Sequence, residues 1–163
     1  MVDAIGVWKD FNVAMVGALA ALGGLVIVAA SVNIADIVKE ASLVARLAAG
    51  VATLVLGLIV AAVGLMPGLP LSVYGIVVIA ATVVVGTFQV VAARHIFRDR
   101  HPQNRMRPLK AVIGFLPLAA YLVGGLMLVV GGAGGLPLLA LGSMLAIVSG
   151  LLVSWIVLVE VLR

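Results

Sequence analysis

The sequence predicts an all-α fold, a polytopic bundle of five transmembrane helices. Two features of composition support this. Hydrophobic residues make up 65% of the chain and charged residues only 10%, whereas a soluble domain has about 45–50% and about 25%. The mean hydropathy is +1.38. The third observation is that the apolar residues form five long runs. We therefore expect residues 1–163 to be a single membrane domain.

Each of the five runs has the length that a helix needs to cross a bilayer, about 20 mainly apolar residues. The predicted helices cover about 11–33, 42–66, 71–93, 111–130 and 136–159. The runs are apolar on all sides, which excludes the short alternating strands of an outer-membrane barrel. Two Asp and one Lys precede the first run, instead of the basic head of a signal peptide, so we expect this helix to be permanent.

The connections between these helices differ in chemistry. Residues 67–70, PGLP, and 131–137, GGAGGLP, predict uncharged turns, because Pro cannot continue a helix and Gly tolerates backbone angles that other residues avoid. Pro137 is placed to start the fifth helix. Residues 34–46 are polar enough to form a short interfacial connection, with Ser42 as the expected N-cap of the second helix.

Basic residues are concentrated on one side of the predicted membrane. With five spans, alternate connections lie on opposite sides, and only Lys9 falls on the side of the N-terminus. The other nine are Lys39, Arg46, Arg94, Arg98, Arg100, Arg105, Arg107, Lys110 and Arg163. Cytoplasmic loops carry an excess of Lys and Arg. We therefore expect the N-terminus outside and the C-terminus in the cytoplasm.

The segment 94–110 carries six of the basic residues and both histidines. If this segment is a cytoplasmic loop, its basic residues are sufficient to set the orientation of the chain in the membrane, and it needs no further role. The alternative is a site for a partner protein or for lipid headgroups, because each Lys or Arg near an anionic surface contributes about 1 kcal/mol. The candidate headgroup ligands are Arg94, Arg98, Arg100, Arg105, Arg107 and Lys110. We expect membrane lipids as partners and no nucleic acid, since aromatic residues for base stacking are few.

Polar side chains within the spans are few, and each is a candidate for function because polar groups are costly in lipid. Asn33, Asp36, Gln89 and Glu160 could converge as a polar cluster at the cytoplasmic face. The alternative, which we favour, is that they are ordinary interfacial caps and groups that form hydrogen bonds between helices. The hydroxyl groups within the spans can bond to a backbone carbonyl one turn back. These are Thr53, Thr82, Thr87, Ser143, Ser149 and Ser154.

Motifs of catalysis and of cofactor binding are missing from the sequence. There is no phosphate loop, no His-Glu-x-x-His and no nucleophile elbow. The chain has no Cys, and its two His lack a neighbouring pattern of metal ligands. No charged residue lies near the middle of a span, where ion-coupled transporters usually need one. We expect no enzymatic activity, no metal and no cofactor.

Small residues recur at helical spacing in three of the spans, where they allow close approach of another helix. The first span has Gly17, Ala21 and Gly24, the second Gly57, Ala61 and Gly64, and the fifth Gly142, Ala146, Gly150 and Ser154. For each stripe we favour packing within the chain over packing against another protein. Val153 is expected to face lipid, and Pro117 to kink the fourth helix or lie in its first turns.

Several segments resemble a family of small bacterial membrane proteins often labelled "modulator of FtsH protease". The similarity involves the Trp, Asp-Phe and small-residue pattern of residues 8–38, the Pro-Gly pair 67–68, the Arg-rich loop and the ending SWIVLVEVLR, residues 154–163. The resemblance implies a multi-pass protein of a bacterial inner membrane and supplies no functional residues.

Together these features predict a non-enzymatic membrane protein that acts by helix–helix association. It would form a homo-oligomer or an accessory subunit of a larger membrane complex. The alternative is an oligomeric channel or small-molecule transporter, whose pore would be lined by the polar residues Thr53, Thr82, Thr87, Gln89 or Ser149.

Overall fold

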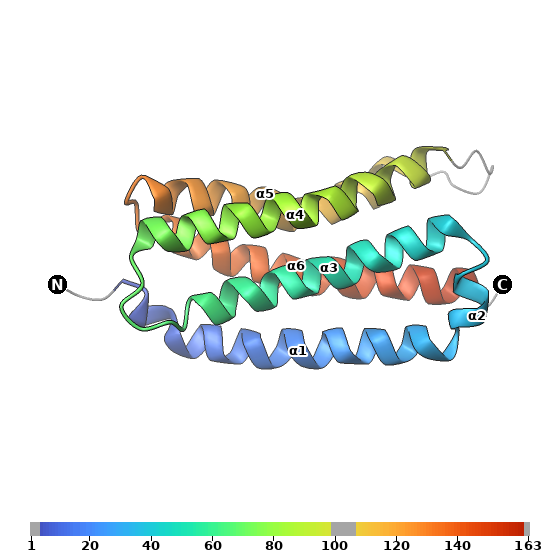
Figure 1. Cartoon of the computed structure of the whole chain (residues 1–163), viewed down its shortest axis with the longest axis horizontal. Helices are drawn as coiled ribbons and strands as arrows, with labels where there is room; N and C mark the ends of the chain where they lie inside the picture. The colour runs from blue at the N-terminus through green and yellow to red at the C-terminus, as the bar shows by residue number, and fades with distance from the viewer. Residues whose placement is uncertain (1–3, 99–106, 162–163) are drawn as a thin grey trace.

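The computed structural model describes residues 4–98 and 107–161 (Figure 1). Throughout these residues the regular structure is helical, with no strand. The elements are the 3₁₀ turn η1 Gly6–Trp8 and the helices α1 Lys9–Val32, α2 Ile34–Ile37, α3 Ala41–Val63, α4 Leu71–Arg98, α5 Arg107–Val129 and α6 Gly135–Val161. Five of the described helices are long and apolar enough to cross a membrane. The predicted all-α fold is confirmed, and the chain is a multi-pass membrane protein.

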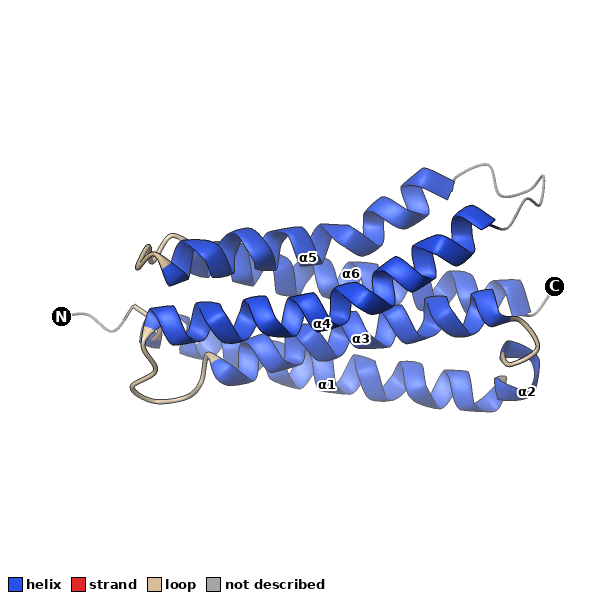
Figure 2. Ribbon diagram, turned by 45° about the horizontal axis from the view of Figure 1, so that its top comes forward, coloured by secondary structure: helices blue, strands red, loops and turns tan. Residues whose placement is uncertain are grey.

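Four of the long helices form a closed bundle, and the fifth lies outside it (Figures 1 and 2). Each of α3, α4 and α5 packs against the next helix in the chain, and α6 packs back against α3. Helix α1 packs mainly on α3, with a smaller contact to α6. One end of the bundle, the basic end, holds the start of α3, the end of α4, the start of α5 and the end of α6; α1 begins at the opposite, turn end.

The basic connection is shorter than predicted, because two helices continue into it. Helix α4 extends to Arg98 and α5 begins at Arg107, so the predicted loop 94–110 is helical at both of its ends. Arg is a good helix former, and no Gly or Pro interrupts residues 94–98. Pro108 lies in the first turn of α5, where a missing N–H leaves no helical bond unmade.

The start of α3 also differs from the prediction. The N-cap is Glu40, whose backbone is extended at φ −121° and ψ 111°, and no side chain caps the helix. The carbonyl of Glu40 accepts the N–H groups of Leu43 and Val44 at 3.0 and 3.2 Å. The helix therefore begins at Ala41, and the expectation that Ser42 is the N-cap is wrong.

The two uncharged turns use Gly as predicted. Gly68 and Gly131 have positive φ values of 68° and 80°, which L side chains rarely adopt. Gly131 ends α5 in a Schellman arrangement, because its N–H donates to Leu128 O at 3.0 Å and the N–H of Gly132 to Met127 O at 2.9 Å. These bonds satisfy carbonyls that the helix end would otherwise leave without a donor.

The outside of the bundle is apolar, as a protein surrounded by hydrocarbon requires. Large side chains such as Leu25, Val83 and Leu126 are 66%, 60% and 58% exposed. The interior is built around two aromatic residues, Tyr74 and Tyr121, which pack with buried Leu and Val from α3 to α6. The contrast between inside and outside therefore lies in packing and hydrogen bonding, and not in hydrophobicity.

Candidate functional site

The polar side chains inside the bundle are amides and hydroxyls, and most of them belong to one of two groups. Besides Tyr74 and Tyr121, the described polar residues that are buried are Asn12, Thr53, Thr82, Gln89, Ser143, Ser149 and Ser154. One group, the glutamine cluster, joins Gln89 and Thr53. The other, the tyrosine cluster, brings together Asn12, Tyr74, Tyr121 and Ser143.

In the glutamine cluster, the side chain of Gln89 crosses from α4 to α3. Its Nε2 donates to Thr53 Oγ1 at 2.8 Å and to the carbonyl of Ala49 at 3.4 Å. Thr53 Oγ1 donates in turn to the same Ala49 carbonyl at 2.8 Å. Gln89 is 6% exposed and Thr53 is fully buried. An amide inside an apolar bundle is thus satisfied by a second helix, and the bond fixes α4 against α3.

Helix α5 makes room for this amide with a Gly. A Cβ placed on Gly114 would lie 2.5 Å from Gln89 Oε1 and 3.2 Å from its Cδ, so any larger residue would displace the amide. Three residues further on, Pro117 lies inside α5 and has no N–H. The carbonyl of Ile113, four residues before it, therefore lacks its usual helical donor. Figure 2 shows α5 changing direction along its length, as a helix with an interior Pro is expected to do.

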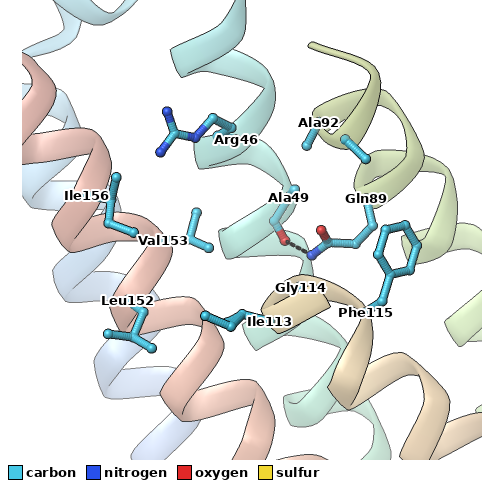
Figure 3. A pocket seen from close by; sticks show the side chains of 11 residues that line it. Arg46, Ala49, Gln89, Ala92, Ile113, Gly114, Phe115, Leu152, Val153 and Ile156 are labelled. Atoms are coloured by element: carbon cyan, nitrogen blue, oxygen red, sulfur yellow. Dashed lines mark hydrogen bonds between the residues drawn. The ribbon is translucent and has the colours of Figure 1, made fainter. Parts of the chain in front are cut away.

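A cavity lies beside the glutamine cluster, toward the basic end, between α3, α4, α5 and α6 (Figure 3). We call it the basic-end cavity. Its empty volume, including the part open to the surroundings, is about 490 Å³. Its two polar lining residues are Gln89 and Arg46, and apolar side chains and Gly114 form the rest. The apolar wall includes Ile113 of α5 and Val153 of α6.

The tyrosine cluster lies toward the turn end. Tyr74 Oη donates to the carbonyl of Val60 at 2.9 Å, and Tyr121 Oη donates to Ser143 Oγ at 3.1 Å. Ser143 Oγ donates to the carbonyl of Leu139, also at 3.1 Å. A smaller cavity of about 240 Å³ is lined in part by Tyr74, Ser143 and Asn12. Uncharged hydroxyl groups thus connect four helices in two pairs, α4 to α3 and α5 to α6.

Three members of this cluster, Asn12, Tyr74 and Tyr121, were not singled out from the sequence. A signal for them was present: the chain has only two Tyr, and both fall inside predicted spans. A buried Tyr hydroxyl usually requires a hydrogen-bond partner, and in lipid that partner must come from the protein. For Asn12 the signal was weaker, because it lies near the start of its span.

The expectation that Ser and Thr bond to their own helix is confirmed in all but one case. Five of the six hydroxyls donate to a carbonyl three or four residues earlier, namely Thr53, Thr82, Thr87, Ser143 and Ser154. Ser149 is the exception. Its buried Oγ has no hydrogen-bond partner within the described chain.

The predicted convergence of four polar residues at the cytoplasmic face is not what the structure has. Asn33 Nδ2 donates to Ala29 O, one turn back in its own helix, at 3.2 Å. Asp36 forms an exposed ion pair with Lys39 at 2.6 Å. Gln89 is engaged within the bundle. Each of these three side chains thus has a partner outside the predicted cluster. The side chain of the fourth residue, Glu160, lies outside the described residues.

The candidate headgroup ligands are described only in part. Arg94 is exposed near the end of α4, at the basic end. The backbones of Arg98, Arg107 and Lys110 are helical, but their side chains lie outside the described residues, as do Arg100 and Arg105 altogether.

The small-residue stripe of α6 faces two neighbouring helices. A Cβ on Gly142 would lie 2.8 Å from ring atoms of Tyr121 in α5, and a Cβ on Gly150 would lie 2.7 Å from Leu54 in α3. Ala146 and Ser154, between and beyond them, are buried. The stripe of α3 is likewise enclosed, since Gly57, Ala61 and Gly64 are all buried. Val153, expected to face lipid, instead approaches α3: its Cγ1 would lie 3.3 Å from a Cβ on Gly50.

The stripe of α1 is different, and the expectation that it packs within the chain is wrong. Gly17, Ala21 and Gly24 are all exposed. A Cβ on Gly17 or Gly24 would meet no atom within 4 Å. The reason is that Leu19, two residues from both Gly17 and Ala21, points into the bundle and packs against Gly57. Two residues correspond to about 200° around a helix, so the stripe points outward.

Comparisons with known protein families, with curated proteins and with solved structures gave no match to this chain. The family resemblance in residues 8–38 and in the later segments therefore stays a prediction.

Proposed function

We propose that this protein is a non-enzymatic integral membrane protein that acts by helix–helix association. It does so as a homo-oligomer or as an accessory subunit of a larger membrane complex, and α1 supplies the associating face. The single observation that carries the proposal is the outward-facing stripe of Gly17, Ala21 and Gly24.

The other helices show how this chain uses Gly. In α3 and α6, Gly57, Gly142 and Gly150 each leave room for large side chains of neighbouring helices. In α4, a Cβ on Gly75 would lie 2.5 Å from the carbonyl oxygen of Gly125 in α5, so two backbones are almost in contact. Gly at helix interfaces in lipid permits such contacts, which stabilise association through packing and weak hydrogen bonds.

On α1, a Cβ added to Gly17 or Gly24 would have no atom of another described residue within 4 Å. An interior helical Gly is less stable than Ala by about 1 kcal/mol. Without a partner helix, Gly17 and Gly24 would bring this cost with no packing in return. Helix α1 also lies outside the closed ring of four helices, so its outer face is accessible along the whole membrane span. A partner helix that packs on α1 explains both features.

The orientation of the chain in the membrane follows from the distribution of its Lys and Arg residues. With the basic end in the cytoplasm, Lys39, Arg46 and Arg94 lie on the side where cytoplasmic loops place such residues, and Lys9 lies outside. The N-terminus is then outside and the C-terminus in the cytoplasm. The membrane we propose is the inner membrane of a bacterium, as the family resemblance implies.

The alternative, a channel or transporter, has less support. Of the residues expected to line a pore, Thr53 and Gln89 bond to each other inside one chain, and Thr82 bonds to its own helix. Thr87 is exposed on the outside of α4. These side chains are thus divided between the interior of one chain and its outer surface, whereas a pore needs them along one path.

The proposal is tested by enlarging the centre of the stripe. Ala21→Leu adds bulk on the outer face of α1, and Ala80→Leu makes the same change at an exposed position of α4. The mass of the assembly extracted in mild detergent is measured by sedimentation. We expect wild type and Ala80→Leu to exceed the 16.6 kDa of one chain, and Ala21→Leu to sediment as one chain. A wild type that sediments as one chain, or an Ala21→Leu assembly that stays intact, contradicts the proposal.

A further inference from the structure

The basic-end cavity separates two pairs of helices. Arg46 and Ala49 contribute from α3, Val153 from α6, Gln89 from α4 and Ile113 from α5. At the turn end the two pairs approach so closely that Gly residues are required: a Cβ on Gly64, after α3, would lie 2.8 Å from Tyr74 Oη in α4, and a Cβ on Gly124 in α5 would lie 3.0 Å from the carbonyl oxygen of Gly135 in α6. In Figures 1 and 2, the basic ends of α4 and α5 rise away from α3 and α6. The cavity thus lies where the helices diverge.

The walls favour an apolar occupant over water. A buried water needs two to four polar partners. The Nε2 group of Gln89 already donates to Thr53 and to the carbonyl of Ala49 in α3. Figure 3 shows Ile113, Val153 and Ile156 directed into the remaining space, opposite the glutamine. The inner part of the cavity is therefore lined mainly by hydrocarbon.

A positive charge lies on the basic-end side of this apolar space. Arg46 is half-buried, and it precedes Ala49 by three residues. In a helix this places the guanidinium-bearing residue about 4.5 Å nearer the membrane surface than Ala49, given a rise of 1.5 Å per residue. Arg46 is the sixth residue of α3, which puts it about 8 Å from the start of the helix. Charge near the surface and hydrocarbon below it match the layout of an anionic phospholipid.

We infer that the basic-end cavity binds one anionic phospholipid. An acyl chain lies between the two helix pairs, against Ile113 and Val153, and ends near Gln89. The phosphate of the headgroup binds the guanidinium of Arg46, whose planar group of donors matches phosphate oxygens. The cavity is partly open to the surroundings, so an acyl chain can enter it from the membrane between the diverging helices. This site is separate from the face of α1, so it does not depend on the association proposed above.

Native mass spectrometry of the full chain tests the inference. The protein, freed of endogenous lipid in mild detergent, is incubated with equal amounts of phosphatidylglycerol and phosphatidylcholine of the same chain length. We expect wild type to retain one phosphatidylglycerol. Arg46→Gln should reduce the preference for the anionic lipid roughly fivefold, the effect of one basic group near an anionic headgroup. Ala93→Phe, which fills the space from α4, should remove the bound lipid whatever its headgroup.

Matched controls separate this site from general contact with lipid. Lys39→Gln removes another positive charge at the same end but outside the cavity, and Ala80→Phe adds the same bulk on the exposed face of α4. Both should retain one phosphatidylglycerol, as wild type does. Circular dichroism checks that each variant is folded, and Ala93→Leu replaces Ala93→Phe if the latter is not.

Three results would overturn the inference. The first is equal retention of the two phospholipids by wild type. The second is undiminished retention by a folded variant with a filled cavity. The third is full displacement of phosphatidylglycerol by an equal amount of free palmitate, which would show that a fatty acid is the occupant.

Discussion

Gly150→Ile tests whether close packing of α6 against α3 holds the bundle together. A Cβ at this position would lie 2.7 Å from two side-chain atoms of Leu54 and 3.1 Å from a third. Optimal carbon–carbon contacts are at about 3.5–4.0 Å, so the new atom is about 1 Å too close. Leu54 is 1% exposed and packs in one cluster with Leu19 and Val26, which leaves it no space to move aside. The two helices must therefore separate.

We expect Gly150→Ile to lower the free energy of unfolding by about 2 kcal/mol. Overpacking of a well-fitted site costs about 1–3 kcal/mol, and the better helix propensity of Ile returns a few tenths of a kcal/mol. For a chain of this size, 1 kcal/mol corresponds to about 2–4 °C in melting temperature, so the expected decrease is about 4–8 °C. Thermal unfolding in mild detergent, followed by circular dichroism, measures it.

Val148→Ile is the matched control on the same helix. Val148 is 53% exposed on the outer face, so its additional methyl group enters hydrocarbon and should leave the melting temperature nearly unchanged. Val153 is unsuitable for this purpose, because it packs against Gly50. If Gly150→Ile melts at the same temperature as Val148→Ile, the close approach of α6 to α3 does not stabilise the bundle, and the reasoning from small-residue contacts is refuted.

Three further predictions concern hydrogen bonds and orientation. A double-mutant cycle of Gln89→Leu and Thr53→Val should give a coupling energy of about 0.6 kcal/mol, the average for hydrogen bonds between helices in lipid; a value of zero would contradict the bond. Tyr121→Phe removes the donor to Ser143 and should lower the free energy of unfolding by about 0.5–1.5 kcal/mol, whereas an unchanged melting temperature would show that the hydroxyl contributes nothing. Reporter tags fused to the two termini should label opposite compartments, with the N-terminal tag outside; two tags in one compartment would contradict the span count.

Sequence predicted the helices well, because the length of an apolar run is itself the physical requirement for crossing a bilayer. It was less accurate at the basic end, where α4 continues to Arg98 and α5 begins at Arg107. Charged residues mark the membrane boundary, but nothing prevents a helix from extending past it. The uncharged turns were identified by their Gly and Pro, which act on the local backbone directly, but their bounds were not: α3 ends at Val63 and not near 66, and α6 begins at Gly135, two residues before Pro137, which was expected to start it.

The interior was harder to predict, since the helices are apolar on every side. In a soluble bundle, the polar face of a helix shows how the helix is rotated about its axis. Helix α6 has apolar side chains on its outer face as well as on its inner face, so it offers no such indication. The position of Gln89 along its span therefore predicted its depth in the membrane but not its partner Thr53. For the same reason it identified the stripe of Gly17, Ala21 and Gly24 but not the direction in which it points. Only the packing of Leu19 against α3 decides that rotation.

Disulfide cross-linking at the face of α1 tests association most directly. The chain has no Cys, so Ala21→Cys carries a single thiol at the centre of the stripe. Val123→Cys is the control, since Val123 is 52% exposed on α5. In native membranes treated with a mild oxidant, we expect Ala21→Cys to give a homodimer. If the partner is another protein, a reagent that joins this thiol through a maleimide and the partner through a photoreactive benzophenone should give a single larger adduct with it. Val123→Cys should stay a single chain under both treatments. If Ala21→Cys forms no adduct under either treatment, or no more than Val123→Cys does, then α1 faces lipid and the proposed association is wrong.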